Sequence, residues 1–319
     1  MSRDWEQRFR AWSKPSSPTE QEQANNAERM IRDAIIASKA LAEHTIEVFA
    51  QGSYKNNTNV REESDVDICV RCMDVFFSDF SMAEGITKGD ADISDASYTY
   101  AQFKNDVGHA LVAKFGQRGV TRGNKAFDVH ENSYRVDTDV VACFEHSRYT
   151  HKDANGKCVH ISGTEFRPDD GGRVINWPEQ QYENGVWKNG KTGNRFKFIT
   201  RALKRLRNEM ADEGVSQADP IASFLIESLV WNVPNEGFGH EAYADDVPFA
   251  LAHTFNNTMK DDDCKEWGEV SDLKYHFRGV QPWTPEQAHT VFGPHPVLLV
   301  SAQARIDRKR FRVQSARDL

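Results

Sequence analysis

Residues 51–70 read QGSYKNNTNVREESDVDICV, and this stretch decides the fold. It opens with Gly52-Ser53 at the end of a short β-type run and closes on a second apolar run that begins with Asp65-Val-Asp67. Residues two apart on a strand point to the same face, so Asp65 and Asp67 project together. The stretch therefore predicts a strand, a polar turn and a second strand with paired carboxylates at its start.

A further acid is expected on a later strand, over residues 134–144. Asp137 and Asp139 share a face there, and Asp139 is preferred because an apolar run follows it directly. Side-by-side carboxylates repel unless a cation neutralises them, and oxygen-only acidic ligands suit Mg²⁺. Asp65, Asp67 and Asp139 are thus predicted as catalytic metal ligands for two Mg²⁺ ions, with Mn²⁺ as a substitute, in a two-metal phosphoryl transfer.

The Gly-Ser pair is predicted to hold the phosphates. Gly52 has no side chain, so a triphosphate can approach its backbone, and Ser53 adds a hydroxyl and an N–H donor. Gln51 belongs to the same turn and is predicted to bind the nucleotide with them. A single Asp-x-Asp or a single Gly-Ser is usually an ordinary strand face or turn, but chance rarely supplies both in this order with a third acid.

Length and composition set the broad class. The chain has 319 residues, which suggests two domains, and its formal charge is 40 − 48 = −8. That charge argues against a general nucleic-acid coat protein, so any anionic ligand must meet a local basic patch. No apolar run is long enough for a membrane span, and the charged N-terminus is unlike a secretion signal, so we expect a cytoplasmic protein without a membrane partner.

The five cysteines are an odd number and scattered, so they predict reduced thiols rather than a disulfide framework. Cys69 and Cys72 form a Cys-x-x-Cys without a second pair to complete a zinc site, and we expect buried thiols there.

The coarse pattern predicts a strand-bearing first half and a helical second half. A helix is expected from Ser17 to about Glu43 and a surface loop over 74–95. The other expected elements are strands at 46–50, 65–70 and 134–144, β structure at 157–166, and helices at 96–115, 195–212, 219–233 and in shorter pieces toward 260 and 310. A boundary near Asn176-Trp177-Pro178 gives predicted domains of 1–175 and 176–319.

These residues resemble the DNA polymerase β-like nucleotidyltransferase superfamily, and more closely its bacterial cGAS/DncV-like branch, the CD-NTases. The resemblance rests on QGSYKNNT, SDVDICV, RVDTDVVACFEHSRY, INWP, FKFITRALKRLRNEM and IASFLIESLVW, within residues 45–233. It implies an α+β fold: a mixed β-sheet core with a long N-terminal helix, and a helical C-terminal lobe.

The resemblance also implies an activity and its substrates. Family members join two or more nucleoside triphosphates, ATP and GTP among them, into a cyclic di- or trinucleotide that activates an effector in CBASS anti-phage defence, with release of pyrophosphate. Base choice, ring size and linkage stay open.

The second lobe carries six cations between Arg195 and Arg207. On a helix Lys197, Arg201 and Lys204 share one face, opposite an apolar face, which predicts a cationic stripe turned toward a ligand. The resemblance implies that Arg201 and Lys204 bind the nucleotide. It also matches Ser223 and Phe224 to a family Ser-Tyr pair whose serine contacts phosphate and whose ring stacks on a base.

Further partners are expected from the same comparison. No His/Cys cluster matches the zinc-bearing insertion of cyclic GMP-AMP synthase, so we expect no DNA activator, a monomer, and control by a protein partner or none. The basic cluster at Arg305–Arg312 is expected to be a surface helix.

Two other functions remain open at this point. One is a nucleotidyltransferase that adds a nucleotide to a linear RNA or small-molecule acceptor. The other is a catalytically silent nucleotide or RNA sensor, which the presence of all three acids with Gly-Ser disfavours.

Overall fold

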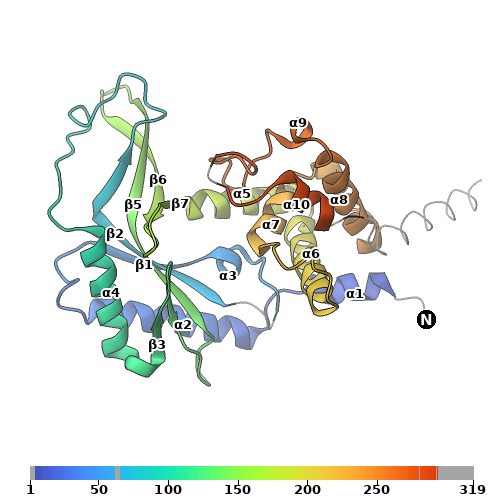
Figure 1. The fold of residues 1–319 in the computed structure, drawn as a ribbon, viewed down its shortest axis with the longest axis horizontal. Coiled ribbons are helices and arrows are strands. Elements are labelled where there is room, and N and C mark those ends of the chain that lie inside the picture. The colour runs from blue at the N-terminus through green and yellow to red at the C-terminus, as the bar shows by residue number, and fades with distance from the viewer. Residues whose placement is uncertain (1–3, 62–64, 280, 292, 294–319) are drawn as a thin grey trace, which may run out of the picture. The chain divides into compact units, whose positions relative to one another are not determined.

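The computed structural model describes residues 4–61, 65–279, 281–291 and 293 (Figure 1). The chain divides into two compact units. The sheet unit comprises residues 16–56 and 62–179, and the helical unit comprises residues 1–15, 57–61 and those from 180 onward, as far as they are described. The sequence-based division placed 1–15 and 57–61 with the first domain, whereas by contacts both segments belong to the helical unit.

A seven-stranded mixed sheet forms the sheet unit. β1 and β2 pair antiparallel, β2 and β5 pair parallel, and β4, β3, β6 and β7 extend the sheet by antiparallel pairing. The strands are β1 (Ile46–Gln51), β2 (Val66–Asp79), β3 (Val120–Arg122), β4 (Phe127–Val129), β5 (Thr138–Lys152), β6 (Cys158–Phe166) and β7 (Val174–Asn176). The expected mixed-sheet core is confirmed.

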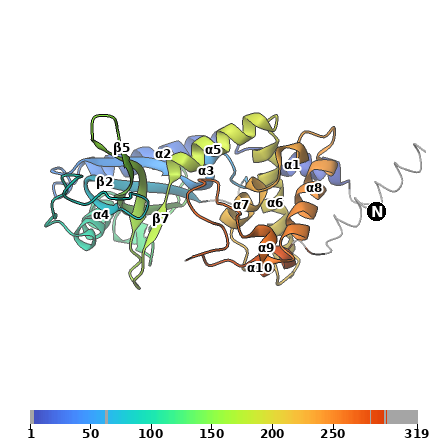
Figure 2. The ribbon, with the colours of Figure 1, turned by 90° about the horizontal axis from the view of Figure 1, so that it is seen from above.

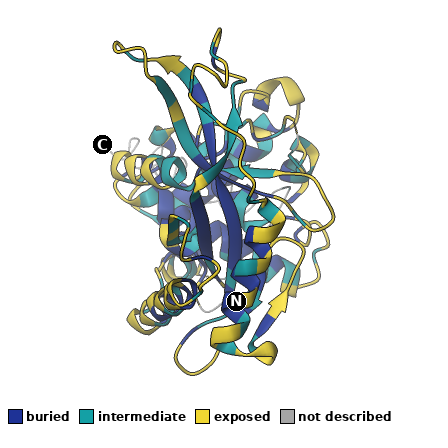
Figure 3. Cartoon of the chain, turned by 90° about the vertical axis from the view of Figure 1, so that its left-hand side faces the viewer, coloured by how far each residue is buried: buried dark blue, intermediate teal, exposed yellow. Residues whose placement is uncertain are grey.

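Two strands are longer than the sequence predicts. β2 continues to Asp79, so the expected loop at 74–95 is wrong over its first residues, and β5 begins at Thr138 and continues to Lys152. The second half of β5 pairs with both β2 and β6, which supplies backbone partners that local sequence does not reveal. Figure 3 shows the central strands buried and the far tip of the β5–β6 hairpin exposed.

Helices α2 (Pro18–Ile36) and α4 (Tyr100–Phe115) pack on the sheet unit's main core, which includes Ile31, Ile68 and Phe103. Each begins at a capping box, Ser17 with Glu20 and Thr99 with Gln102, and these caps fix where the helices start. α2 ends at Ile36 rather than near Glu43, because the chain turns there and brings Leu41 into the core. A short 3₁₀ helix (Gln117–Gly119) follows α4.

The helical unit, whose helices are drawn in Figure 2, has its own apolar core. Phe196, Leu203 and Leu206 of α6 are buried there with Leu225 and Leu229 of α7, as their spacing predicts. α6 spans Arg195–Asp212, as predicted, and α7 is shorter than predicted at Ser223–Trp231. The other helices are α1 (Trp5–Trp12), α5 (Pro178–Lys191), the 3₁₀ helix Asn235–Gly237, α8 (Tyr243–Asn257), α9 (Asp261–Cys264) and α10 (Pro285–Val291).

Two expectations concern residues at the end of the chain. The helical piece near 310 and the basic cluster Arg305–Arg312 lie outside the described residues. Within the described ranges, none of the helices combines the length and apolarity that a bilayer crossing requires.

Candidate active site

A row of carboxylates crosses three neighbouring strands of the sheet. Asp67 of β2 is paired in parallel register with Asp139 of β5, and Asp139 is paired in antiparallel register with Asp128 of β4. Side chains of directly paired residues lie on the same face of a sheet. Asp65 lies just before β2, two residues from Asp67, and so extends the same face. The structure thus brings together the three aspartates that the sequence singled out.

The carboxylates of this row repel one another, and this repulsion acts on Asp65 and Asp139. Burial, followed by repulsion from Asp137, Asp128 and Glu131, raises the pKa of Asp65. Burial, followed by repulsion from Asp65, Asp128 and Asp137, raises the pKa of Asp139. In the described part of the chain, no ion pair joins either carboxylate to a cation. A divalent cation would remove this repulsion, and an oxygen-only donor set suits Mg²⁺ or Mn²⁺.

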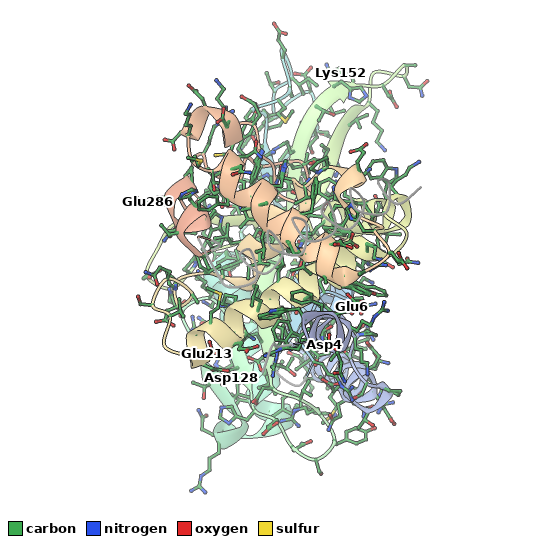
Figure 4. The ribbon with its side chains drawn as sticks, turned by 90° about the vertical axis from the view of Figure 1, so that its right-hand side faces the viewer. Asp4, Glu6, Asp128, Lys152, Glu213 and Glu286 are labelled. Atoms are coloured by element: carbon green, nitrogen blue, oxygen red, sulfur yellow. The ribbon has the colours of Figure 1, made fainter. Side chains whose placement is uncertain are left out.

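Asp128 is the residue of this row that sequence reasoning missed. It lies on the three-residue strand β4 and has a weak ion pair with His130, at 3.6 Å. Figure 4 labels Asp128 near the start of β5 and Lys152 at its far end, so the acidic row lies at one end of the longest strand. Asp137, the alternative third acid, precedes β5 and accepts a hydrogen bond from the Glu131 N–H at 2.6 Å.

Gly52 fits closely against this row. Its φ of +64° lies in the left-handed region, and a Cβ added there would lie 2.2 Å from Oδ2 of Asp67. Only glycine allows both this backbone conformation and this close approach. The Asp67 carboxylate therefore packs directly against the Gly52 backbone.

The residues after Gly52 form a one-turn helix, α3 (Gly52–Asn56), where the sequence predicted only a turn. Tyr54 anchors it because its ring is buried in the core of the sheet unit. Burial, with smaller effects of Glu20 and Asp65, raises the pKa of Tyr54 to about 12, so this side chain stays neutral. Gln51 and Ser53, both half-buried, flank Gly52 on the chain.

The predicted cationic stripe of α6 is buried. The exposed fractions of Lys197, Arg201 and Lys204 are 9%, 0% and 2%. The Lys204 ammonium lies 2.8 Å from Oε2 of Glu227 and 3.3 Å from the Thr58 hydroxyl. The stripe that the sequence turns toward a ligand is thus buried in the structure, and the charge of Lys204 is already paired. The contact of Lys204 with a triphosphate stays a prediction.

Arg201 is buried without a carboxylate partner in the described chain. Its Nε donates to the Ser13 carbonyl at 2.7 Å, Nη1 donates to the Asn57 carbonyl, and Nη2 has no hydrogen-bond partner. Burial lowers the pKa of Arg201 to about 10. The Lys197 ammonium lies 5.6 Å from the Tyr182 ring centre, and among the described residues no carboxylate forms an ion pair with it.

The buried face of α6 therefore holds three cations against the single anion Glu227. Buried charges are normally paired, so an excess of positive charge is the electrostatic condition that an anionic ligand would relieve.

Ser223 and Phe224 lie half-buried at the start of α7. The Ser223 hydroxyl accepts a hydrogen bond from Nη2 of Arg207 at 2.8 Å. The Phe224 ring packs against Trp283 with ring centres 6.2 Å apart, at a tilt of 31°. One face of a partly exposed aromatic ring thus remains a candidate stacking surface.

Comparisons with known proteins identify the family to which this chain is similar. A family profile for the cGAS/DncV-like nucleotidyltransferase C-terminal helical domain matches residues 183–294. A cyclic dipyrimidine nucleotide synthase, CdnE, from Legionella pneumophila is 51% identical over 90% of this chain and 95% of its own length. A protein of the same name from Cecembia lonarensis is 42% identical over 91% of this chain and 96% of its own length.

A solved structure is also similar. The Rhodothermus marinus CdnE c-UMP-AMP synthase with Apcpp and Upnpp superimposes with a TM-score of 0.77 at 29% identity, covering 90% of this chain and 93% of that one. Identities of 51% and 42% over nine-tenths of the chain confirm the family resemblance seen in the sequence. The chain belongs to the cGAS/DncV-like nucleotidyltransferases, enzymes that join nucleoside triphosphates into cyclic oligonucleotides.

Proposed function

We propose that this enzyme makes a cyclic dinucleotide from pyrimidine nucleoside triphosphates, at the carboxylate row of Asp65, Asp67 and Asp139. The observation that supports this site is the register that sets Asp67 beside Asp139, with Gly52 against the Asp67 carboxylate. Base choice is supported by the two dipyrimidine synthases, at 51% and 42% identity, against 31% and 33% for relatives named for purine products.

The proposed reaction is a nucleotidyl transfer carried out twice. A ribose hydroxyl oxygen forms a bond to the α-phosphorus of a second nucleotide, the bond from that phosphorus to pyrophosphate breaks, and the hydroxyl proton is released. A second, ring-closing transfer releases a second pyrophosphate. Two Mg²⁺ ions, or Mn²⁺ in their place, would be held by the three aspartates and would supply charge neutralisation at the phosphates.

The chain's own residues have separate proposed roles. The Gly52 backbone allows a triphosphate to approach closely, and the Ser53 hydroxyl donates a hydrogen bond to a phosphate oxygen. Asp139 would hold the cation that binds the attacking hydroxyl and would take the proton of that hydroxyl. A general base must lie within hydrogen-bond reach of the proton it removes.

The helical unit is proposed to contribute nucleotide contacts of two kinds. Arg201, whose Nη2 is unpartnered, and Lys204 face the buried polar layer of α6 and would contact phosphate oxygens. Ser223 would donate its hydroxyl to a phosphate while accepting from Arg207, and Phe224 would stack on a base, which is worth about 1–3 kcal/mol.

The biological setting is proposed from the family. The product would activate an effector in CBASS anti-phage defence, with the enzyme acting in the cytoplasm as a monomer. A regulatory protein from the same defence system is proposed as a partner. Neither DNA nor a membrane is proposed as one.

The experiment is incubation with each nucleoside triphosphate alone and with all four, in Mg²⁺, followed by phosphatase treatment, mass spectrometry and linkage-specific nucleases. We expect a phosphatase-resistant product containing two pyrimidine nucleotides. A resistant product built only from purines would overturn the base assignment, and phosphatase-sensitive chains alone would overturn cyclisation. The doubly substituted Asp65→Asn, Asp67→Asn protein is the control, and we expect no product from it.

A further inference from the structure

A second group of potential metal ligands lies at the other end of the β1–β2 pair from Gly52. His44 comes just before β1, and Cys72 and Asp74 lie on β2. The imidazole, thiol and carboxylate ligand atoms lie within 4.8 Å of one another. Within the described ranges, no other three His, Cys, Asp or Glu side chains bring their ligand atoms this close.

The strand register explains why these three side chains meet. Ile46 pairs with Cys72, and the Met73 N–H donates to the Thr45 carbonyl at 2.9 Å, so the antiparallel pairing continues toward His44. In that register His44 lies opposite Asp74. Cys72, two residues from Asp74 on the same strand, points to the same face.

The three groups already contact one another. Nδ1 of His44 lies 2.9 Å from Oδ2 of Asp74, and the Cys72 thiol donates to Oδ1 of Asp74 at 3.3 Å. The Thr45 N–H also donates to Oδ1 of Asp74, at 2.9 Å. These hydrogen bonds therefore orient the imidazole, the thiol and the carboxylate in the metal-free protein.

Neighbouring side chains hold the imidazole in place. The His44 ring stacks on Tyr98 with ring centres 4.1 Å apart and planes 17° apart. The Tyr98 hydroxyl donates to Asp106 at 2.6 Å, which fixes the tyrosine in turn. Such outer contacts orient the ligands in protein metal sites.

We propose that His44, Cys72 and Asp74 bind a Zn²⁺ ion, with water as the fourth ligand. A nitrogen, a sulfur and an oxygen together suit a borderline-soft transition ion, whereas Mg²⁺ takes oxygen ligands. The thiol loses its proton to solvent on binding, and one thiolate with one carboxylate then balances the charge of the ion. This site is separate from the carboxylate row and does not depend on the proposed function.

The geometry needs only small movements. A tetrahedral zinc site with ordinary bond lengths sets its ligand atoms about 3.4–3.8 Å apart. The Cys72 sulfur already lies 3.3 Å from Oδ1 of Asp74. The distance from Nδ1 of His44 to Oδ2 of Asp74 is 2.9 Å and must widen. Cys72 is fully buried, but the side chains of His44 and Asp74 are 18% and 38% exposed, so an ion can enter from their side.

The consequence would be structural. The ion would join the start of β1 to the middle of β2, while the opposite end of the same strand pair sets Gln51 beside Asp67. Cys72 lies five residues beyond Asp67 along β2, which is about 17 Å on an extended strand. The site would therefore brace the strand pair that carries Gly52 without touching the catalytic carboxylates.

The test uses the full chain with Asp65→Asn and Asp67→Asn, so that the carboxylate row loses most of its affinity for cations. The protein is stripped with chelator, kept reduced, and titrated with Co²⁺ as a spectroscopic probe for Zn²⁺. We expect one equivalent to produce a thiolate-to-cobalt charge-transfer band, which added Zn²⁺ abolishes. The band should be lost in Cys72→Ser, and at least tenfold more Co²⁺ should be needed in His44→Gln.

The matched control is Cys158→Ser, which removes a half-buried thiol outside the cluster and should keep the band. Because Cys72 is buried, its variant could fold poorly, so a second measurement uses the partly exposed His44. Zn²⁺ should raise the melting temperature of the parent protein and leave that of His44→Gln unchanged. No charge-transfer band, or a band that persists in a folded Cys72→Ser protein, overturns the proposal.

Discussion

Asp67 of β2 and Asp139 of β5 lie directly opposite each other in parallel register, and Asp128 of β4 faces Asp139 from the other side. Like charges placed directly opposite on a sheet are destabilising, so this arrangement works against the stability of the fold. A row of acids that weakens the sheet is explained by a function in binding divalent cations. This relationship allows the cost and the function of the same residues to be measured separately.

Asp139→Asn should lower dinucleotide synthesis by at least about a hundredfold, because a metal-holding group worth several kcal/mol is removed. In the absence of metal the same change should raise the free energy of unfolding at pH 7 by about 0.5–1 kcal/mol, because a repulsive pair is removed. Initial rates and denaturant unfolding measure the two effects. A fully active Asp139→Asn enzyme would rule out this residue as a metal ligand.

The stability gain should depend on pH in a definite direction. The pKa of Asp139 is raised in the folded state, so the folded state binds more protons than the unfolded state between the ordinary and the raised pKa. Stability is therefore lost as pH rises through that interval, and the advantage of Asp139→Asn should appear above it and vanish below about pH 4. Asp137→Asn changes a carboxylate two residues earlier and is the control for the loss of synthesis in Asp139→Asn. It should keep activity.

Gly52→Ala should abolish activity and lower the free energy of unfolding. The left-handed backbone alone costs about 1–2 kcal/mol for a residue with a Cβ, and here the Cβ would also collide with Asp67. Gly85→Ala separates the two effects, because Gly85 has a similar φ of +72° with nothing within 4 Å of an added Cβ. We expect Gly85→Ala to lower the free energy of unfolding by about 1 kcal/mol and to keep full activity. Equal losses in both variants would contradict a role for the close approach at Asp67.

Much of this site follows from local sequence, because its main signals are short-range. Alternation places Asp65 and Asp67 on one face, and helical spacing identifies α6 from Arg195 to Asp212 without error. Family resemblance then supplies the mixed β-sheet core and the helical second lobe, which periodicity cannot. The three principal acids were therefore predictable before any contact was known.

The features that escaped prediction depend on distant partners. β4 has three residues and is a strand because Asp128 and its neighbours pair with β3 on one side and β5 on the other. The pairing of Lys204 with Glu227 and Thr58 was not predicted, because those two residues lie far from it in the sequence. Amphipathic spacing reports which residues share a face of a helix, and it does not report what buries that face.

Lys204→Met should destabilise the protein by about 3–5 kcal/mol, because it leaves the Glu227 carboxylate buried without its counter-charge. Adding Glu227→Leu should restore most of that loss, because two apolar side chains can replace a buried ion pair. Denaturant unfolding of the three variants measures this as a double-mutant cycle. Additive losses would contradict the pairing.

Acid should remove the contribution of the same pair. Burial alone would raise the pKa of Glu227, but the Lys204 ammonium and hydrogen bonds from Thr58 and Gln181 lower it below its usual 4.5. The pair's contribution is therefore complete above about pH 4.5 and is lost as pH falls toward the lowered pKa. The wild-type protein should lose more stability than the double variant over this interval, and identical pH profiles would contradict a charged pair.

Phe224→Ala should raise KM for the nucleotides by roughly 5- to 150-fold, since stacking on a base is worth about 1–3 kcal/mol. The ring also packs against Trp283, so the same change lowers stability, and KM must be measured well below the melting temperature. Phe224→Tyr keeps the ring and should keep KM, while Trp187→Ala removes a ring that is 56% exposed on α5 and should leave KM unchanged. A melting temperature that falls while KM stays constant would make Phe224 a packing residue, and base recognition would then have to come from other side chains.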